Sequence, residues 1–365
     1  MKKISLFILL APILSCDFQD DPTIPPSEWE YAQPGEVGVQ EEPLFNLDEK
    51  LKDGIYGQIN SLVIIKDDNL IYESYYNNTD RNALVQTFGI SVSVASILAG
   101  IALDQGILPE LNTPIQEVLS GNQSAFEDPL RAQITLRHLV EMRTGIAWNE
   151  FLRPFNDPQN TANQMQFSPD WSTFTLNEPM EAVPGGRFAY SSGAIMVLSK
   201  IIQEQSGMSL EEFAVQNLLE PLGISEYNWS SDPSGVTNAA WGLDMTTISM
   251  AKIGYLVLNR GRWFSNRVLP GDYIEEMTSL QSQFNFNNDF GLSWWRFSDF
   301  NFFVQNLEVN DISFAWGAGG QFIFVVPQYN LVVATSASNF GPQVNAQIAF
   351  NMLFEDIIPA IDTSL

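Results

Sequence analysis

The feature that most constrains this chain is an uninterrupted apolar and small-residue stretch at residues 89–106, GISVSVASILAGIALDQG. Larger apolar side chains such as Ile90, Val94 and Ile101 recur at the three- and four-residue spacing of an α-helix. Gly106 is a typical helix stop, because glycine readily adopts the left-handed conformation that ends many helices. A helix that is apolar nearly all round belongs in a core, so this stretch predicts a buried helix around which the chain packs.

Length and composition limit the possible classes of protein. The 365 residues allow one large domain or two, and 45% hydrophobic content is typical of a globular chain. Lys and Arg number 17 against 43 Asp and Glu, for a net charge of -26. This acidity disfavours nucleic acid, anionic membrane surfaces and acidic polymers as partners. The only histidine, His138, cannot build a zinc site alone, and we expect neither a metal nor a cofactor.

The N-terminus has the pattern of an export signal. Two lysines precede an apolar run too short to span a membrane, which predicts a signal peptide over residues 1–15. Cys16, the only cysteine, follows directly, an arrangement that resembles a bacterial lipoprotein signal and implies a lipid on Cys16. A plain secretory peptide is the alternative. Residues 16–33 are rich in acid and proline and are expected to form an extended tether, in an exported protein of the bacterial cell envelope that faces the periplasm or the cell surface.

Strand patterns occupy both ends of the remaining chain, and helical patterns occupy its middle. Strands are predicted at residues 61–66, 70–76, 290–295, 320–326 and 331–335, with turns at 67–69 and 327–330. Helices are predicted at residues 46–51, 89–106, 135–145, 196–207, 208–222, 247–259 and 344–358. Residues 150–180 lack periodicity, which is typical of a lid or a loop that lines a cleft.

These patterns predict an α/β fold of the α+β type. One antiparallel sheet is built from both termini, and a helical subdomain is inserted in it. The expected domain covers residues 34–365, with its sheet part at about 45–110 and 284–365 and its helical part at about 111–283.

Four segments, in the right order, resemble the serine β-lactamase and penicillin-binding-protein family, in particular its esterase and aminohexanoate-dimer-hydrolase branch. The stretch at 89–106 resembles the family's nucleophile helix, which opens Ser-x-x-Lys and continues through a Gly-Ile-Ala-Ile-Asp-x-Gly-like run. Aligning residues 100–106 with that run places Gly89 at the serine position and Val92 at the lysine position. The resemblance therefore implies that the nucleophile and its base are both missing, since glycine and valine supply neither.

Two further motifs of the resemblance describe the rest of the site. Tyr190-Ser191-Ser192 resembles Tyr-x-Ser, whose tyrosine helps to move the proton and whose third residue, here Ser192, helps to hold the substrate. Ala315-Trp-Gly-Ala-Gly-Gly-Gln321 resembles the cleft-lining strand of the esterase branch and implies a substrate-binding role for Gly317, Ala318 and Gly319. The backbone N–H groups of Ala318 and Gly89 would then form an oxyanion hole. A glycine-rich bend in a strand is the alternative.

A fourth segment, residues 134–145, resembles the family's Ile-Thr-Ile-Arg-His-Leu-Leu segment, with a helix capped by Thr135. This context favours a structural role for His138. Ser249-Met-Ala-Lys252 is literally Ser-x-x-Lys, but it lies far along the chain from the nucleophile position and is expected to be structural too.

The sequence thus implies a β-lactamase-related lipoprotein that has lost acyl-enzyme chemistry and binds a small ester, amide or peptide as a pseudoenzyme. Two alternatives stay open. One is an active esterase or amidase with a displaced nucleophile such as Ser91, activated by Tyr190, although a helix turns residue 91 roughly 200° away from residue 89. The other is a structural or partner-binding envelope protein, whose partners the sequence does not indicate.

Overall fold

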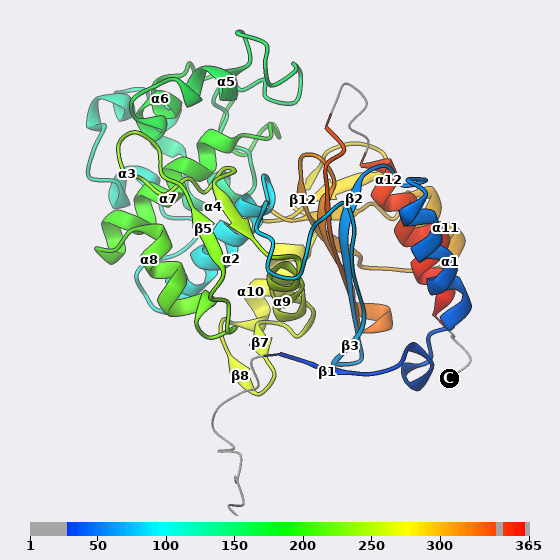
Figure 1. The fold of residues 1–365 in the computed structure, drawn as a ribbon. Helices are drawn as coiled ribbons and strands as arrows, with labels where there is room; N and C mark the ends of the chain where they lie inside the picture. The colour runs from blue at the N-terminus through cyan, green and yellow to red at the C-terminus, as the bar shows by residue number, and fades with distance from the viewer. Residues whose placement is uncertain (1–27, 341–345, 362–365) are drawn as a thin grey trace, which may run out of the picture.

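The computed structural model describes residues 28–340 and 346–361. In these residues a nine-stranded sheet separates a large helical lobe from a smaller layer of helices (Figure 1). From one edge to the other, its strands are β1 (Glu30–Tyr31), β3 (Asn69–Tyr75), β2 (Ile59–Lys66), β14 (Leu331–Ala337), β13 (Gln321–Val326), β12 (Ser313–Gly317), β11 (Trp295–Phe297), β10 (Asn288–Phe290) and β9 (Ser282–Gln283). Both ends of the chain build the sheet, so the predicted fold class is confirmed.

Helices fill the middle of the chain and flank its ends. They are α1 (Glu41–Lys52), α2 (Ile90–Asp104), α3 (Ile115–Val118), α4 (Leu136–Val140), α5 (Thr161–Gln166), α6 (Trp171–Asn177), α7 (Ser192–Ser206), α8 (Leu210–Ala214), α9 (Thr247–Leu258), α10 (Gly271–Thr278), α11 (Phe302–Leu307) and α12 (Gln347–Asn351). Two small sheets join β4 (Val85–Gln86), β6 (Leu243–Met245) and β5 (Tyr227–Trp229), and β7 (Arg262–Trp263) with β8 (Asn266–Arg267). In the described part of the chain, no helix is long and apolar enough to cross a bilayer.

The strands β2 and β3 form the predicted hairpin. All strand pairs in the large sheet are antiparallel except β1 with β3. Asp67 and Asp68 have φ values of +48° and +62°, the conformation of a two-residue primed turn, so this turn is one residue shorter than predicted. On its other edge β2 pairs with β14, which places Val63 opposite Ala334 and closes the sheet between the two ends of the chain.

Several predicted boundaries differ from the structure. The helix predicted at 135–145 ends at Val140, and the helix predicted at 46–51 begins at Glu41. Residues 290–295 are not one strand, because Phe290 ends β10 and Trp295 begins β11, and the turn between them holds Ser293 at φ +59°. A continuous apolar run does not reveal such a reversal. Part of the predicted tether is folded as well, because β1 pairs with β3 and the buried Trp29 contacts Trp263 edge to face at 5.4 Å. The predictions for residues 1–15 and for Cys16 lie outside the described residues.

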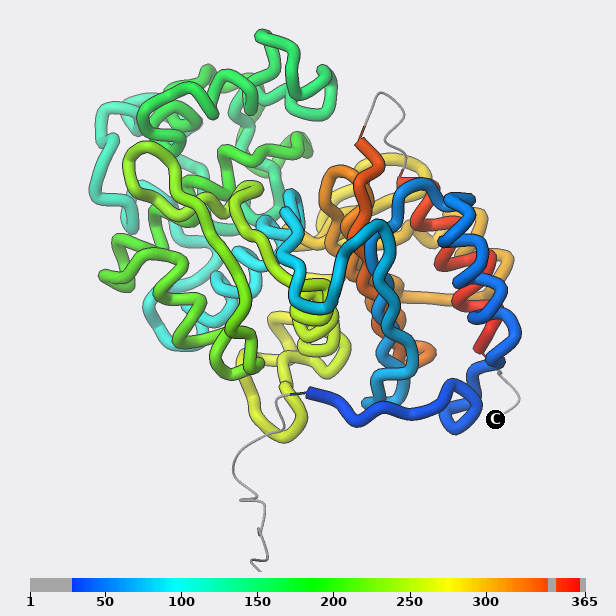
Figure 2. The backbone as a smooth tube through the Cα atoms, in the orientation of Figure 1, coloured from blue at the N-terminus to red at the C-terminus, as the bar shows by residue number. Residues whose placement is uncertain are grey.

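The terminal helices cover one face of the sheet. The helical run from α12 continues through Met352–Ile357 to Ile358–Ala360, and it packs against α1. Figure 2 shows these first and last segments side by side, in blue and red. Lys50 of α1 forms an ion pair with Asp356 at 2.5 Å. Of the predicted closing helix, residues 344 and 345 lie outside the described part of the chain.

The helix α2 is the buried helix that its sequence predicts. All residues from Ile90 to Ala102 are buried, and the helix lies between β12 and α7. Its buried hydroxyls have partners, since Ser93 donates to the carbonyl of Ser293 and Ser96 to that of Leu292, both at 2.7 Å. Buried polar groups that are paired in this way hold the helix in one position.

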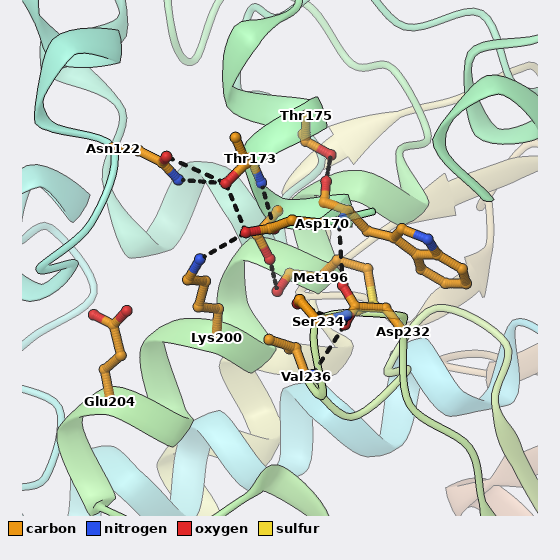
Figure 3. Close-up of polar contacts among 12 residues, drawn as sticks. Asn122, Asp170, Thr173, Thr175, Met196, Lys200, Glu204, Asp232, Ser234 and Val236 are labelled. Atoms are coloured by element: carbon orange, nitrogen blue, oxygen red, sulfur yellow. Dashed lines mark hydrogen bonds and ion pairs between the residues drawn. The ribbon is translucent and has the colours of Figure 1, made fainter. Parts of the chain in front are cut away.

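A polar network inside the helical lobe fixes α7 (Figure 3). Asp170 caps α6 by accepting from the N–H of Thr173, and it also accepts from Lys200 of α7 at 3.2 Å. Asp232 is 5% exposed and accepts from the N–H groups of Trp171 and Val236. These contacts matter for the site because α7 begins at Ser192.

Candidate functional site

A cavity of about 540 Å³ lies where α2, α7 and β12 meet. Four residues singled out from the sequence line it: Gly89, Tyr190, Ser192 and Ala318. The start of α2 supplies the first, the segment that leads into α7 the next two, and the turn after β12 the last. The structure therefore brings together residues from three distant motifs.

Other predicted site residues lie elsewhere. Val92 is 1% exposed and belongs to the hydrophobic core. Gly317, at the end of β12, packs against the loop that precedes α2, and Gly319 lines a much smaller pocket beside Phe340. These residues shape the backbone near the cavity without being part of its wall.

The start of α2 and the end of β12 approach so closely that a side chain on Gly89 or Gly317 would force the backbone to move. A Cβ on Gly89 would lie 2.5 Å from the carbonyl oxygen of Trp316 and 3.0 Å from the Tyr190 hydroxyl. A Cβ on Gly317 would lie 2.2 Å from the carbonyl oxygen of Thr87. Backbone atoms cannot rotate away as a side chain can, so the space that a nucleophile would need at position 89 is filled by the β12 backbone.

Two backbone donors of the predicted oxyanion hole have no partner in the part of the chain that the structure describes. Among the described residues, no acceptor forms a hydrogen bond with the N–H of Gly89 or with that of Ala318. Both residues line the cavity. Unpaired N–H groups that face a cavity can donate to a carbonyl or an anion of a ligand.

Ser91 points away from the cavity. Its side chain is 0% exposed, and its hydroxyl accepts from the N–H of Leu243 at 3.2 Å and lies 3.3 Å from the Thr87 hydroxyl. It is not among the residues that line the cavity. The geometry thus gives Ser91 a structural role between α2 and β6, and does not favour it as a displaced nucleophile.

Tyr190 is held in an aromatic stack. Its ring lies parallel to that of Phe151 at 4.3 Å and near-parallel to that of Trp295 at 5.9 Å. Burial, with a smaller contribution from the negative charge of Glu150, raises the pKa of the Tyr190 hydroxyl far above its usual value. The hydroxyl therefore stays protonated at neutral pH and can donate a hydrogen bond, but it is a poor base.

Glu150 is the residue of the site that sequence reasoning missed. Its carboxylate accepts from the hydroxyl of Ser192 at 2.6 Å, from the Ser192 N–H at 2.9 Å and from the Trp148 indole N–H at 2.8 Å. It thus sits at the N-terminal end of α7, where the helix dipole favours an anion. Burial nevertheless raises the pKa of this carboxyl, and the hydrogen bonds from Ser192 offset part of the rise.

Aromatic rings make up most of the wall. Eight of the fifteen lining residues are aromatic. They form three groups of rings in contact: Phe151, Tyr190, Trp295 and Trp316; Phe155 and Trp241; Phe88 and Phe340. Among the described residues that line the cavity, Glu150 is the only charged one. The wall is therefore mostly aromatic, and the side chain of Glu150 is its one acidic group among these residues.

The segment at 150–180 lines the cavity, as its lack of periodicity predicts. It supplies Glu150, Phe151, Phe155 and Gln166. It is not irregular throughout, because it contains the short helices α5 and α6. These helices were missed because each is stabilised by a capping side chain and by packing rather than by a long apolar period.

The remaining candidates are structural in this geometry. His138 accepts through Nδ1 from the N–H of Thr135, whose hydroxyl in turn accepts from the His138 N–H, a reciprocal cap at the start of α4. Lys252 of the literal Ser-x-x-Lys donates to the carbonyl of Gly223 at 2.8 Å and lies over the Trp263 ring. Neither residue lines the cavity.

Comparisons with known proteins agree with this architecture. The structure is similar to that of a candidate 6-aminohexanoate-dimer hydrolase from Bacillus anthracis, with a TM-score of 0.72, 18% identity and coverage of 91% of this chain and 87% of that one. It is also similar to a penicillin-binding protein homologue from Pyrococcus abyssi, with a TM-score of 0.65, 20% identity and coverage of 87% and 77%. At these identities the likeness shows the fold of the serine β-lactamase and penicillin-binding-protein class.

The sequence comparison identifies the family. The β-lactamase family profile matches residues 54–354, so the chain belongs to the β-lactamase family. An uncharacterised protein from Alkalihalophilus pseudofirmus is 24% identical over 319 residues, which cover 77% of this chain and 84% of that protein.

Proposed function

We propose that this protein is a pseudoenzyme of the β-lactamase family, which binds a small ligand in its cavity and forms no acyl-enzyme. The observation that carries the proposal is the closure at Gly89, where the carbonyl oxygen of Trp316 lies 2.5 Å from the position of a Cβ. Position 89 therefore lacks both a nucleophile and the room for one. Loss of a catalytic nucleophile typically lowers the rate by orders of magnitude.

The lysine that accepts the proton in the family's motif is missing as well. Val92 is buried and apolar, and the Tyr190 hydroxyl has a strongly raised pKa. A general base must be able to hold and release a proton near the working pH, which neither residue does.

The retained cavity supports binding. A volume of about 540 Å³ lies within the range of about 300–1,000 Å³ that is usual for small-molecule sites. The unpaired N–H groups of Gly89 and Ala318 support a carbonyl-containing ligand such as a small ester, amide or peptide. The name of the Bacillus anthracis protein, a hydrolase of an amide dimer, is consistent with this class.

Fluorophosphonate labelling and ester hydrolysis test the loss of chemistry. The protein should show no covalent labelling and no hydrolysis above the uncatalysed rate. A panel of small esters, amides and peptides, screened by thermal shift, should contain a compound that raises the melting temperature, because a ligand stabilises the state that binds it. Labelling at a serine would overturn the proposal, and the absence of any stabilising compound would favour a structural or partner-binding protein.

A second candidate function is an active hydrolase that uses Ser192. One observation favours it: the Ser192 hydroxyl donates to Glu150 at 2.6 Å inside the cavity, the arrangement of a nucleophile and its base. Labelling that Ser192→Ala abolishes and Ser91→Ala leaves intact would establish it. We favour the pseudoenzyme because Ser192 is 2% exposed and its own N–H also donates to Glu150, so the pair acts as a helix cap.

We further propose that the protein is an exported lipoprotein, anchored through a lipid on Cys16 in the bacterial cell envelope. The pattern of residues 1–16 supports this location. Expression in bacteria with an alkyne-tagged fatty acid should label the protein, and Cys16→Ser should remove the label. Labelling of the Cys16→Ser variant would overturn the proposal of a lipid anchor. An absence of labelling on the native chain would overturn it too.

A further inference from the structure

We infer that the ligand of this cavity carries an organic cation, a quaternary or protonated amine attached to a small ester, amide or peptide. The inference rests on the proposed function in one respect, namely that the cavity binds a ligand. It adds the charge of that ligand, which neither the family nor the sequence motifs indicate.

The first observation is the density of aromatic faces. Phe151 and Tyr190 stack at 4.3 Å with an interplanar angle of 9°, and Trp316 lies with its centroid 6.2 Å from that of Phe151. Phe155 and Trp241 form a second pair of rings at 5.7 Å. Stacking of Phe151 on Tyr190 covers one face of each ring, and the faces that ring contacts leave uncovered at the cavity are negatively polarised and can attract a cation. Quaternary ammonium groups are recognised in proteins by arrangements of this kind.

The second observation is the sign of the charge in the cavity. Glu150 supplies a carboxylate, and no lysine or arginine is among the described residues that line this space. Arg187 lines an adjoining pocket that shares Glu150 and Tyr190, but it is paired with Glu181 at 2.8 Å. The whole chain carries a net charge of -26, which raises the local concentration of cations around it.

The third observation is the burial of the Glu150 carboxyl. Burial raises the pKa of the Glu150 carboxyl because its charged form is poorly solvated there, and the hydrogen bonds from Ser192 and Trp148 offset only part of the rise. A bound cation would supply the missing opposite charge and stabilise the ionised form. A neutral ligand would leave this cost in place, and an anionic ligand would increase it.

A matched pair of probes tests the charge directly. Choline and 3,3-dimethylbutan-1-ol have the same shape, and only choline is charged. Calorimetry or ligand-observed NMR should show that choline binds at least tenfold more tightly than the alcohol. Hexanoate should bind more weakly than either.

Variants assign the binding to this cavity, with benzyltrimethylammonium as the probe. Glu150→Gln should weaken binding at least tenfold, whereas Glu226→Gln, the same change at an exposed position away from the cavity, should leave it unchanged. Phe155→Leu should weaken binding about threefold or more. Phe167→Leu is its matched control, since Phe167 is 80% exposed and does not line the cavity. Thermal unfolding of each variant reports whether it is folded.

The outcomes separate this inference from the proposed function. Equal binding of choline and the alcohol, tighter binding of hexanoate, or no binding of any cation would overturn the charge assignment. Cation binding that Phe155→Leu and Glu150→Gln leave unchanged would also overturn it, because the binding would lie elsewhere. Fluorophosphonate labelling tests the lost chemistry independently of ligand charge.

Discussion

Substitution of Gly89 by alanine tests whether the nucleophile position is closed. The change adds one methyl group in a backbone conformation that alanine tolerates, since φ and ψ of Gly89 are -61° and -11°. Any loss of stability must therefore come from contacts. The added Cβ would meet the carbonyl oxygen of Trp316 at 2.5 Å and the Tyr190 hydroxyl at 3.0 Å, so the end of β12 or the start of α2 has to move.

The expected cost follows from two opposing terms. Overpacking a well-packed site costs about 1–3 kcal/mol. Replacing glycine with alanine restricts the unfolded chain and stabilises the protein by about 0.4–1 kcal/mol. The net loss should be about 1.3 kcal/mol at the midpoint of these ranges, which for a chain of this size lowers the melting temperature by about 2 °C.

Urea denaturation beside Gly121→Ala gives the comparison. A Cβ on Gly121 meets nothing within 4 Å, so this control should be neutral or slightly stabilised. Addition of Tyr190→Phe to Gly89→Ala should recover only part of the loss, because the backbone oxygen of Trp316 is the closer contact. If Gly89→Ala is as stable as Gly121→Ala, position 89 has room for a side chain and the structural argument for the pseudoenzyme fails.

Three further predictions follow from single side chains. Burial raises the pKa of Glu150, so the folded protein holds this proton more tightly than the unfolded chain, and the stability contribution of the group falls as pH rises above its ordinary value of 4.5. The free energy of unfolding of Glu150→Gln relative to the native protein should therefore increase over that pH interval, and a flat difference would contradict the assignment. Burial lowers the pKa of His138 from 6.5, so the native protein should lose stability as pH falls through that region, a step that titration of His138→Gln should not show. Asp232→Ala leaves buried N–H donors without an acceptor, so it should lower the free energy of unfolding in urea by about 2–4 kcal/mol. Asp80→Ala at an exposed position should lower it by under about 1 kcal/mol. Equal losses would refute the role given to Asp232.

Much of the fold could be predicted from the sequence, because the signals are local. The apolar period of α2, the hairpin at Asp67 and Asp68 and the glycine that ends α7 at Gly207 each depend on residues a few positions apart. The reversal between β10 and β11 could not be predicted, because a buried strand and a buried turn of apolar residues look alike in sequence. The pairing of β1 was missed because it depends on a distant strand.

The candidate site, like the fold, has one part that the sequence predicts and another that depends on the tertiary structure. The sequence by itself determined that residue 89 has no hydroxyl and residue 92 no amine, since side-chain chemistry needs no coordinates. Only the tertiary structure decided that the space for a side chain at residue 89 is filled, because the carbonyl oxygen of Trp316 reaches Gly89 from a strand more than two hundred residues away. The tertiary structure also decided the positions of Glu150 and of the aromatic residues that line the cavity. Their charge and rings become a binding site only when the packing of α2 between α7 and β12 brings distant segments around one cavity.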